Sequence, residues 1–444
     1  MKTVCRIAAL TLLLALAVAA PASAASTTVQ GESMSGGTIF SDAKASGGKA
    51  ALLRPTLTIS ATVNTIAAAQ MVVVARGDQC AGAPTMRVSV DGAEVFTRDV
   101  ANTSWNNYTV PTAILAGSHT ISVSFLNDYQ SSSCDRNLRV DYVRVDTINT
   151  ATTNPLKNQS LWVDPNSNAS KTAALWRTIN PLGAARLDVL AARSQADWFG
   201  DFSGDVKAAV NAKVTAAAAA GKTATLVAYN IPLRDCSSYS GGGATSADAY
   251  KAWIRAFAAG IGSRKAIVIL EPDALAMLDC IPADQRGPRM DLIADAVSVL
   301  AKSNIFTYVD IGHSAWLATD HAAGRLWRSG VAKARGFSLN VSNFRSTSEL
   351  VAYGKDVSDR LGGKGYVIDT SRNGAGPTPD GSWCNPFTAR IGAAPAIAPG
   401  NGPDANLYVK RVGESDGPCN GGPAAGVWWP EAAAGMVSDL VPSL

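Results

Sequence analysis

The sequence predicts two structural units of different class, an all-β sandwich followed by an α/β barrel. Residues 26–147 contain short β-rich runs separated by Gly and Asn/Asp breaks, with no segment of helical periodicity between them. Residues 154–444 instead alternate Ala-rich helical stretches with short apolar runs, which is typical of a parallel sheet covered by helices. The junction between the units is polar and short, so we expect the two domains to lie close together.

Length, composition and charge exclude some classes of protein function. The chain has 444 residues, of which 47% are hydrophobic and 17% are charged. This composition permits a large core and excludes a disordered or coiled-coil chain. The formal net charge is only +4, which is far too small for a nucleic-acid-binding footprint. We therefore expect no nucleic-acid partner.

Residues 1–24 predict a signal peptide. Lys2 and Arg6 flank the start of an apolar run at residues 7–20, and small residues at 21–24 supply a cleavage site. The run is short for a membrane anchor, and no later stretch reaches the roughly 20 apolar residues that a bilayer span requires. We therefore predict a secreted, extracellular protein with no membrane partner.

The cysteines predict disulfide bonds in an oxidising compartment. Cys5 leaves with the leader, so an even number remains. Metal ligation is disfavoured because no C-x-x-C spacing occurs. The six cysteines follow one another along the sequence as three neighbouring pairs, and the simplest of the 15 possible connectivities is therefore local. The expected pairs are Cys80 with Cys134, Cys236 with Cys280, and Cys384 with Cys419.

In the first unit, alternating apolar and polar residues predict strands with one buried face. These strands are expected at residues 70–75, 86–90, 93–100, 120–126 and 138–145. The apolar runs of the second unit predict parallel strands at residues 223–229, 266–270, 305–309, 336–340, 365–368 and 406–409.

Acidic residues recur where the strands of the second unit end. They are Asp235, Asp273, Asp310, Asp369, Glu414 and Asp416. In a parallel barrel these strand ends share one rim, which is where such folds hold their active sites. Each carboxylate could instead cap a helix or form a structural ion pair, but their recurrence at five strand ends favours a site.

Crowded carboxylates predict acid–base chemistry on an acetal. Mutual repulsion should keep one of them protonated near neutral pH as a general acid, while an ionised one acts as base. Glycoside hydrolysis needs such a pair. Trp198, Trp316 and Trp383 lie next to loops or strand ends, where their rings could stack on sugars. Trp253, within a helical stretch, is expected in the core.

Two other chemistries are disfavoured. The three histidines, His119, His313 and His321, are scattered, and no H-E-x-x-H motif is present. A serine nucleophile would need a G-x-S-x-G turn, which the sequence lacks.

The motifs of the second unit resemble those of glycoside hydrolase family 6, which comprises endoglucanases and cellobiohydrolases. The two signature stretches are residues 227–236, VAYNIPLRDC, and residues 269–276, ILEPDALA. Further matches are DIGHSAW at 310–316, NVSN at 340–343, WCN at 383–385, KRVGESDG at 410–417 and WWPE at 428–431.

The resemblance implies a distorted (β/α) barrel that cleaves β-1,4-glucan with inversion and needs no cofactor for catalysis. Asp273 matches the proton donor, and Asp235 matches the residue beside it that raises its pKa and stabilises the oxocarbenium charge. Asp416 matches the carboxylate proposed as base, which acts directly or through a water chain closed by the loop 237–243. Tyr229 matches the residue that crowds the distorted sugar.

The resemblance also implies the sugar-binding positions and two of the disulfides. The sugar-binding residues would be Trp198, Ser240, His313, Trp316, Asn340, Trp383, Lys410 and Glu414. The pairs Cys236/Cys280 and Cys384/Cys419 match loop disulfides of the family. One departure is Arg411-Val412, where the family often has proline.

Endo action is favoured because only residues 417–427 separate Asp416 from Trp428. Exo-acting members of the family resemble one another in long loops that roof the site, and this segment is too short to form much of a roof. We therefore expect a monomeric endo-β-1,4-glucanase acting on cellulose or a related β-glucan. The alternatives are a cellobiohydrolase, a xylanase or mixed-linkage glucanase, and a non-catalytic polysaccharide-binding protein.

The first unit resembles a calcium-dependent, xylan-binding type of carbohydrate-binding module. The matching stretches are GDQCAGAP at 77–84, NDY at 127–129 and CDRNL at 134–138. The resemblance implies xylan as a second partner and a calcium ion held by Asp128 and Asp135, with Asn127 or Asp78 helping. Glu32 with Asp141 could hold a second, structural ion. Alternatively, these acidic residues form turns beside the Cys80/Cys134 bridge.

Overall fold

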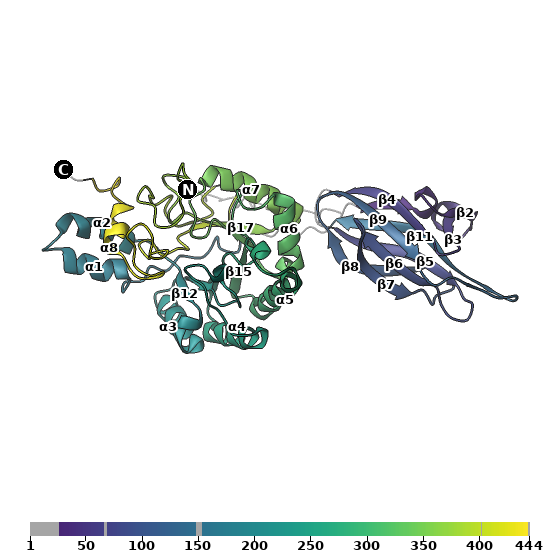
Figure 1. The fold of residues 1–444 in the computed structure, drawn as a ribbon, viewed down its shortest axis with the longest axis horizontal. Helices are drawn as coiled ribbons and strands as arrows, with labels where there is room; N and C mark the ends of the chain where they lie inside the picture. The colour runs from purple at the N-terminus through teal and green to yellow at the C-terminus, as the bar shows by residue number, and fades with distance from the viewer. Residues whose placement is uncertain (1–25, 66–68, 148–152, 401, 443–444) are drawn as a thin grey trace, which may run out of the picture.

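The computed structural model describes residues 26–65, 69–147, 153–400 and 402–442, which form a β-sandwich and an α/β domain (Figure 1). The expected leader, with Cys5, lies outside the described residues.

The predicted sandwich is confirmed as two antiparallel sheets. One has the strand order β2-β3-β11-β5-β8, with β1 and β10 also pairing with β11, and the other has the order β4-β9-β6-β7. The strands are β1 (Ser26–Gln30), β2 (Thr38–Ser41), β3 (Lys49–Leu53), β4 (Thr58–Thr65), β5 (Ala69–Asp78), β6 (Thr85–Val90), β7 (Ala93–Asp99), β8 (Asn106–Ile114), β9 (Gly117–Phe125), β10 (Tyr129–Gln130) and β11 (Asp135–Thr147).

Alternation along the strands places one face of each sheet in the sandwich core. Met86 and Val88 of β6 and Val123 of β9 are fully buried, whereas the residues between them are only partly covered. This is the pattern expected of sheets with one solvated face.

The second domain contains a curled, mostly parallel sheet, which confirms the predicted distorted barrel. Its strand order is β12-β13-β14-β15-β16-β17-β19-β18, and only β18 runs antiparallel to its neighbour. The strands are β12 (Asp197–Phe199), β13 (Ala224–Ala228), β14 (Ala266–Leu270), β15 (Ile305–Asp310), β16 (Gly336–Leu339), β17 (Gly365–Asp369), β18 (Ala396–Ile397) and β19 (Ala405–Leu407).

The barrel is distorted because β12 and β19 do not form a ladder. Instead, the N–H of Ala196 donates to the carbonyl of Tyr408 over 2.9 Å, and the indole N–H of Trp198 donates to the carbonyl of Val409 over 2.8 Å. These bonds hold the segments that lead into and out of the two strands, so the rim between them remains open for side chains.

Both faces of the sheet are buried. In β13, Leu226 and Ala228 pack toward the helices, whereas Val227 packs into the barrel interior with Ile267 and Ile269 of β14. Two buried faces explain why these strands appear in the sequence as continuous apolar runs.

The helices surround this sheet (Figure 1). They are α1 (Asn168–Trp176), α2 (Pro181–Ala191), α3 (Val206–Ala219), α4 (Ala247–Ile261), α5 (Ala283–Leu300), α6 (Thr319–Arg328), α7 (Thr347–Arg360) and α8 (Pro430–Gly435). Ser246 and Ser346 cap α4 and α7 by accepting the N–H groups of Ala249 and Glu349. Within the described residues, no helix combines the length and apolar character needed to cross a membrane.

The expected disulfide pairing is confirmed. Cys80 is bonded to Cys134, Cys236 to Cys280, and Cys384 to Cys419. The domains are in contact where Arg360 of α7 donates to the carbonyl of Ala116, 3.3 Å away, in the turn between β8 and β9.

Candidate active site

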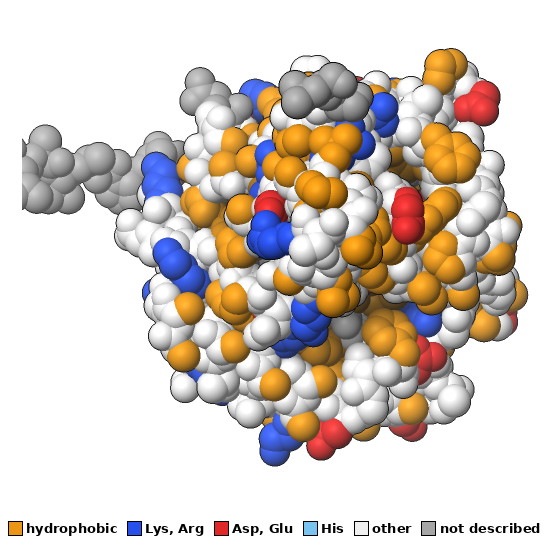
Figure 2. Space-filling view, turned by 90° about the vertical axis from the view of Figure 1, so that its left-hand side faces the viewer, with side chains coloured by type: hydrophobic (Ala, Val, Ile, Leu, Met, Phe, Trp, Pro, Cys, Tyr) orange, Lys and Arg blue, Asp and Glu red, His pale blue; other side chains and the backbone are white. Residues whose placement is uncertain are grey.

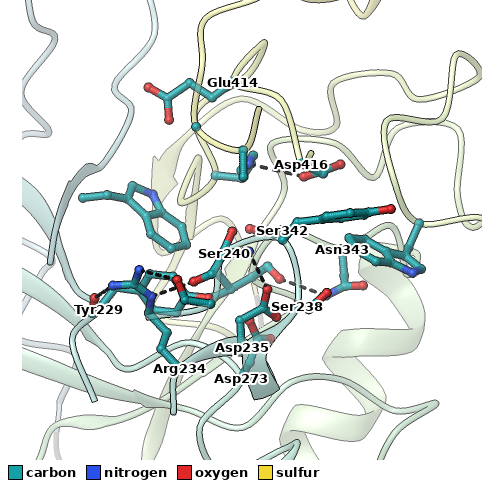
Figure 3. A pocket seen from close by; sticks show the side chains of 18 of the residues that line it. Tyr229, Arg234, Asp235, Ser238, Ser240, Asp273, Ser342, Asn343, Glu414 and Asp416 are labelled. Atoms are coloured by element: carbon teal, nitrogen blue, oxygen red, sulfur yellow. Dashed lines mark hydrogen bonds and ion pairs between the residues drawn. The ribbon is translucent and has the colours of Figure 1, made fainter. Parts of the chain in front are cut away.

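A cleft of about 1060 Å³ lies at the carboxyl ends of the parallel strands. The end of the molecule that faces away from the β-sandwich is visibly hollowed (Figure 2). Most of the predicted site residues line the cleft, namely Trp198, Tyr229, Asp235, Ser240, Asp273, Trp316, Trp383, Lys410, Glu414 and Asp416. Figure 3 shows Asp235 and Asp273 together on one side, with Asp416 and Glu414 on the other.

Asp273 has the environment of a protonated carboxylic acid. Burial raises its pKa well above the usual value, and the nearby carboxylates of Asp310 and Asp235 raise it further, against the opposing charge of Lys410. Within the described part of the chain, no N–H or hydroxyl group donates a hydrogen bond to its carboxyl group. Asp273 is therefore the carboxyl group that keeps its proton at the cleft surface.

The buried carboxylate of Asp310 fixes the backbone position of Asp273. This carboxylate accepts the N–H groups of Asp273 and Gly312, over 3.0 and 3.1 Å, and the hydroxyl group of Ser338 over 3.1 Å. Burial raises the pKa of Asp310 to about 7, although these donors favour the ionised form. Because donors surround Asp310 and none reaches the carboxyl group of Asp273, the proton of this pair resides on Asp273.

The loop after β13 holds Asp235 in a left-handed backbone conformation with φ of 54°, followed by Cys236 at 47° and Ser237 at 63°. Such conformations cost about 1–3 kcal/mol each and persist only when surrounding contacts enforce them. The bond between Cys236 and Cys280 is one of these contacts.

Two buried charged residues fix the same loop. The carboxylate of Glu271 accepts the N–H groups of Asn230 and Ile231, each over 3.0 Å. Arg234 donates to the carbonyls of Tyr229 and Ser240, both over 2.8 Å. These bonds set the direction in which Asp235 enters the cleft.

Asp235 is partly buried and faces Asp273. Its Oδ2 atom accepts the N–H of Ser240 over 2.9 Å. Burial raises its pKa, the charge of Asp416 raises it further, and Arg234 and Lys410 act in the opposite direction. Asp235 can therefore sustain the raised pKa of Asp273 and can stabilise positive charge that develops between them.

Asp416 has the opposite electrostatic environment and is ionised. Arg372 donates to both of its oxygens over 2.9 and 2.7 Å, and the ammonium group of Lys410 lies 3.3 Å from Oδ1. Burial alone would raise its pKa, but the charges of Arg372 and Lys410 lower it to about 2. The cleft thus carries a neutral acid and an ionised carboxylate, the pair that glycoside hydrolysis requires.

Aromatic rings border the acidic groups. Tyr229 is 6% exposed, and its ring meets that of Trp198 edge-on at a centroid distance of 5.0 Å. Burial and the charges of Asp273 and Asp235 raise the pKa of Tyr229 well above its usual value, so the phenol remains neutral. Trp316 and Trp383 are 40% and 49% exposed, and these accessible rings suit contact with sugar faces.

Two predicted sugar-binding residues are not among those that line the cleft. His313 is buried behind Trp316, with ring centroids 4.2 Å apart, and burial lowers its pKa to about 4. Asn340 is fully buried and donates to the carbonyl of Asp369 over 2.9 Å. In this structure both residues support the cleft wall, and their contact with sugar stays a prediction.

Not every strand-end carboxylate belongs to the chemistry. Asp369 is buried and accepts four backbone N–H groups, including those of Ser342 and Lys410 at 2.9 and 3.0 Å. It joins the loops after β16 and β19. For Asp369, the structural role that the sequence left open is the one observed, whereas Asp310 both accepts backbone N–H groups and raises the pKa of Asp273.

Several cleft residues were not found by sequence reasoning. Phe202, Arg372 and Val427 are among them, whereas Arg234, Ser342 and Asn343 lie in the quoted motifs and Ser238 and Tyr239 in the loop 237–243, without a role assigned to each. Arg372 matters most because it is the main partner of Asp416, and its contact spans 44 residues of sequence. A buried carboxylate demands a cation, but the sequence alone does not show which arginine provides it.

The residues expected to bind calcium in the β-sandwich differ in whether their oxygen atoms are free to contact a cation. Asp78 is held by Arg139 over 2.8 Å, and the side-chain oxygen of Asn127 accepts the N–H of Thr85 over 2.6 Å, so neither oxygen group is free for a cation. Asp128 is exposed and Asp135 is partly buried, on the β10–β11 hairpin. In the described ranges, no group of three or more His, Cys, Asp or Glu residues could hold a metal.

The Glu32 and Asp141 pair fits a cation better. One carboxylate oxygen of Glu32 is buried without a hydrogen-bond partner in the described structure. Burial raises the pKa of Asp141, and the charges of Glu32 and Asp42 raise it further. A cation between the two carboxylates would relieve both this repulsion and the unpaired oxygen.

The models of two known families match the chain. The model of glycosyl hydrolases family 6 matches residues 156–440. The model of a Ca-dependent, xylan-binding carbohydrate-binding module matches residues 70–158.

Curated relatives are endoglucanases that match about two thirds of the chain. Endoglucanase A of Cellulomonas fimi is 43% identical over 289 residues, which are 64% of this chain and 62% of that relative's length. Endoglucanase 1 of Streptomyces halstedii is 40% identical over 289 residues, which are 62% of this chain and 88% of that relative. The match therefore spans less than two thirds of the C. fimi protein.

Solved structures agree with the sequence relatives. The endoglucanase Cel6 from Mycobacterium tuberculosis, in complex with methyl-cellobiosyl-4-deoxy-4-thio-β-D-cellobioside, superposes with a TM-score of 0.61 at 45% identity and covers 64% of this chain and 98% of its own. Endoglucanase CEL6B from Humicola insolens gives 0.57 at 27% identity, over 65% of this chain and 98% of its own. The family match, the barrel and the paired carboxyl groups together show that this chain belongs to family 6 of the glycosyl hydrolases.

Proposed function

We propose that the protein is an endo-β-1,4-glucanase that inverts the anomeric configuration. The observation that carries this proposal is the position of Asp273, in an environment that favours its protonated form, at the surface of the cleft and opposite the ionised Asp416. The endoglucanase names of the relatives support it. The C. fimi protein extends beyond the matched region, so the activity of this chain needs its own test.

In the proposed mechanism, Asp273 donates its proton to the glycosidic oxygen as the bond to the anomeric carbon breaks. Asp235 stabilises the oxocarbenium charge through its nearby carboxylate. Tyr229 crowds the distorted sugar with a neutral ring. A water molecule attacks the opposite face of the sugar and loses its proton to Asp416, directly or through further waters. A carboxylate with a pKa of about 2 is a weak base. Such a base is sufficient if the water loses its proton only after it has begun to bond to the oxocarbenium ion, because the bonding makes the water more acidic.

The short loop after Asp416 supports endo action. Glu414 forms an isolated antiparallel bridge with Trp428, so the intervening residues return at once to the cleft wall. A cleft that is not roofed there can bind the interior of a chain. A cellobiohydrolase is the alternative that the assay below distinguishes.

We further propose that the protein is exported, as residues 1–24 indicate, and that the β-sandwich binds xylan through calcium. Asp128 and Asp135 would hold the ion that contacts the sugar, and Glu32 with Asp141 would hold a structural ion. The family match of residues 70–158 supports this role. Xylan in the same plant material would keep the barrel near its glucan substrate.

The test is hydrolysis of soluble substituted cellulose, barley glucan and xylan by wild type, Asp273→Ala and the exposed control Asp284→Ala. We expect Asp273→Ala to lower kcat by about two to four orders of magnitude while oligosaccharide binding stays nearly intact, and the control to retain full activity. A rapid fall in viscosity per reducing end released indicates endo action, and a slow fall indicates a cellobiohydrolase. Equal turnover by Asp273→Ala would overturn the acid assignment.

Two further outcomes separate the remaining alternatives. Preference for xylan or barley glucan would reassign the substrate. Binding without hydrolysis by the wild type would show a non-catalytic polysaccharide-binding protein. Proton NMR of the first-formed product anomer tests inversion.

A further inference from the structure

A second cavity, of about 180 Å³, adjoins the active-site cleft. The two share lining residues, because Arg411 and Glu414 face both. In Figure 3, Glu414 lies at the opposite side of the cleft from Asp273. The second cavity therefore continues the cleft at a distance from the reacting groups.

A chain of ion pairs lines the second cavity and reaches the active-site cleft at Arg411 and Glu414. Lys213 lies 2.8 Å from Asp164 and 3.0 Å from Asp197. Arg411 pairs with Asp197 and also lies 3.2 Å from Glu414. These alternating charges fix the carboxylate of Glu414 at the junction, with one oxygen engaged by Arg411. Its second oxygen has no partner in the described residues and is available to a ligand in either cavity.

The charge balance indicates a neutral ligand. Three carboxylates line the second cavity, those of Asp164, Asp197 and Glu414, against four cationic side chains, those of Lys171, Arg193, Lys213 and Arg411. The ion pairs already neutralise most of these charges, so the cavity attracts neither a multivalent anion nor a metal ion.

The groups that stay unpaired suit the hydroxyl groups of a sugar. In the described structure, the ammonium group of Lys171 and the side-chain amides of Asn166 and Asn168 have no hydrogen-bond partner, although all three line the cavity. Trp428 adds an aromatic ring, oriented by its indole N–H, which donates to Thr172 over 3.0 Å. Donors, acceptors and an aromatic ring in one small cavity are the combination that orients a polyol.

The cavity has room for about six water molecules, which is close to the space that one glucosyl unit occupies. We propose that it is an additional glucosyl-binding subsite, which holds a β-glucan chain where it extends past Glu414. This inference rests on the proposed action of the cleft on β-glucan. It adds a reason for endo action, because a chain that continues beyond the cleft would gain contacts there.

The test compares wild type with the double variant Asn168→Ala/Lys171→Ala and with the filling variant Asn168→Trp. Both positions are exposed at the start of α1 and line only the second cavity. Lys207→Ala, exposed on α3 and away from both cavities, is the matched control. The substrates are cello-oligosaccharides of increasing length, labelled at the reducing end.

We expect wild type and Lys207→Ala to show the same rise of kcat/KM with chain length. In both cavity variants, the ratio of kcat/KM for long over short substrates should fall by about five- to tenfold, and the preferred cleavage position should shift. If the variants keep the full chain-length gain and cleavage pattern, the cavity holds only water and the inference is wrong. If the wild type cleaves no β-glucan of any length, the proposed function itself fails.

Discussion

The backbone N–H of Asp273 donates to the buried carboxylate of Asp310 over 3.0 Å. This bond joins the loop after β14 to the last residue of β15, so the two parallel strands fix the position of the acid. The same neighbour sets the protonation of Asp273, because a second carboxylate so close raises its pKa. One residue thus controls both the position and the proton of the acid.

Asp310→Asn should preserve the position of Asp273 while removing the charge. The amide oxygen can still accept the N–H groups of Asp273 and Gly312. Loss of the like charge should lower the pKa of Asp273, so the alkaline limb of the kcat/KM profile should move to lower pH. The measurement is a pH–rate profile on a soluble β-glucan, with Asp284→Asn as control. An unchanged or raised alkaline limb would show that Asp310 does not hold Asp273 in its protonated form.

Arg372→Gln should move the acid limb in the opposite direction. Arg372 is the main charge that lowers the pKa of Asp416 to about 2, and its loss should raise that pKa. The acid limb of the rate profile should therefore move to higher pH. Since the variant leaves a buried carboxylate without its main partner, we also expect a loss of about 3–5 kcal/mol in the free energy of unfolding.

The pH dependence of the stability of the fold gives a second test of the ion pair between Arg372 and Asp416. Because the folded-state pKa of Asp416 is below its usual value of 3.8, the ion pair stabilises the fold above that pH and loses this effect as the pH falls toward 2. In Arg372→Gln the pKa of Asp416 rises toward or above 3.8, so this loss of stability at low pH should shrink or reverse. Melting temperatures between pH 2 and 6 measure it, and curves with the same pH dependence would contradict the assigned pairing.

The strands of the barrel could be predicted from sequence because both faces of the sheet are buried. The apolar run at residues 266–270 coincides with β14. In contrast, β12 has only three residues and includes Asp197, whose charge is paired with Lys213 and Arg411. A strand whose polar residue is neutralised by distant partners has no apolar run to identify it.

The sequence locates the carboxylates at the strand ends, but it does not show which of them reach the cleft surface and which are structural. Asp273 and Asp310 both follow apolar runs, yet one reaches the cleft surface and the other accepts backbone N–H groups. That difference depends on the left-handed conformation of Asp273, with φ of 69°, which the residue types do not specify. Sequence patterns indicate the rim, and backbone geometry decides which side chains reach its surface.

Calcium should stabilise the β-sandwich through Glu32. Its unpaired buried oxygen and the raised pKa of Asp141 indicate that a cation would lower the electrostatic free energy of the folded state. We expect added Ca²⁺ to raise the melting temperature of the wild type and chelation to lower it. Glu32→Gln should abolish the response, whereas Glu94→Gln, exposed on β7, should retain it. An equal calcium response in Glu32→Gln would exclude this pair as the binding site.

Gly417 leaves room for Tyr239 of the loop 237–243 at the cleft. A Cβ atom at Gly417 would lie only 2.5 Å from the ring of Tyr239, and that ring lies 6.0 Å from the ring of Trp383. Tyr239 precedes Ser240, whose N–H holds the carboxylate of Asp235. Gly417→Ala should therefore displace Tyr239, loosen Asp235 and lower kcat by about tenfold or more.

A double-mutant cycle tests this coupling. Tyr239→Ala removes the ring that Gly417→Ala would displace, so the double variant should be no slower than Tyr239→Ala alone. Gly400→Ala is the control, because its φ of 146° is close to the 155° of Gly417 and no atom lies near the added Cβ. Additive losses in kcat would show that Gly417 acts through Asp416, its neighbour in sequence, and not through the loop that carries Asp235.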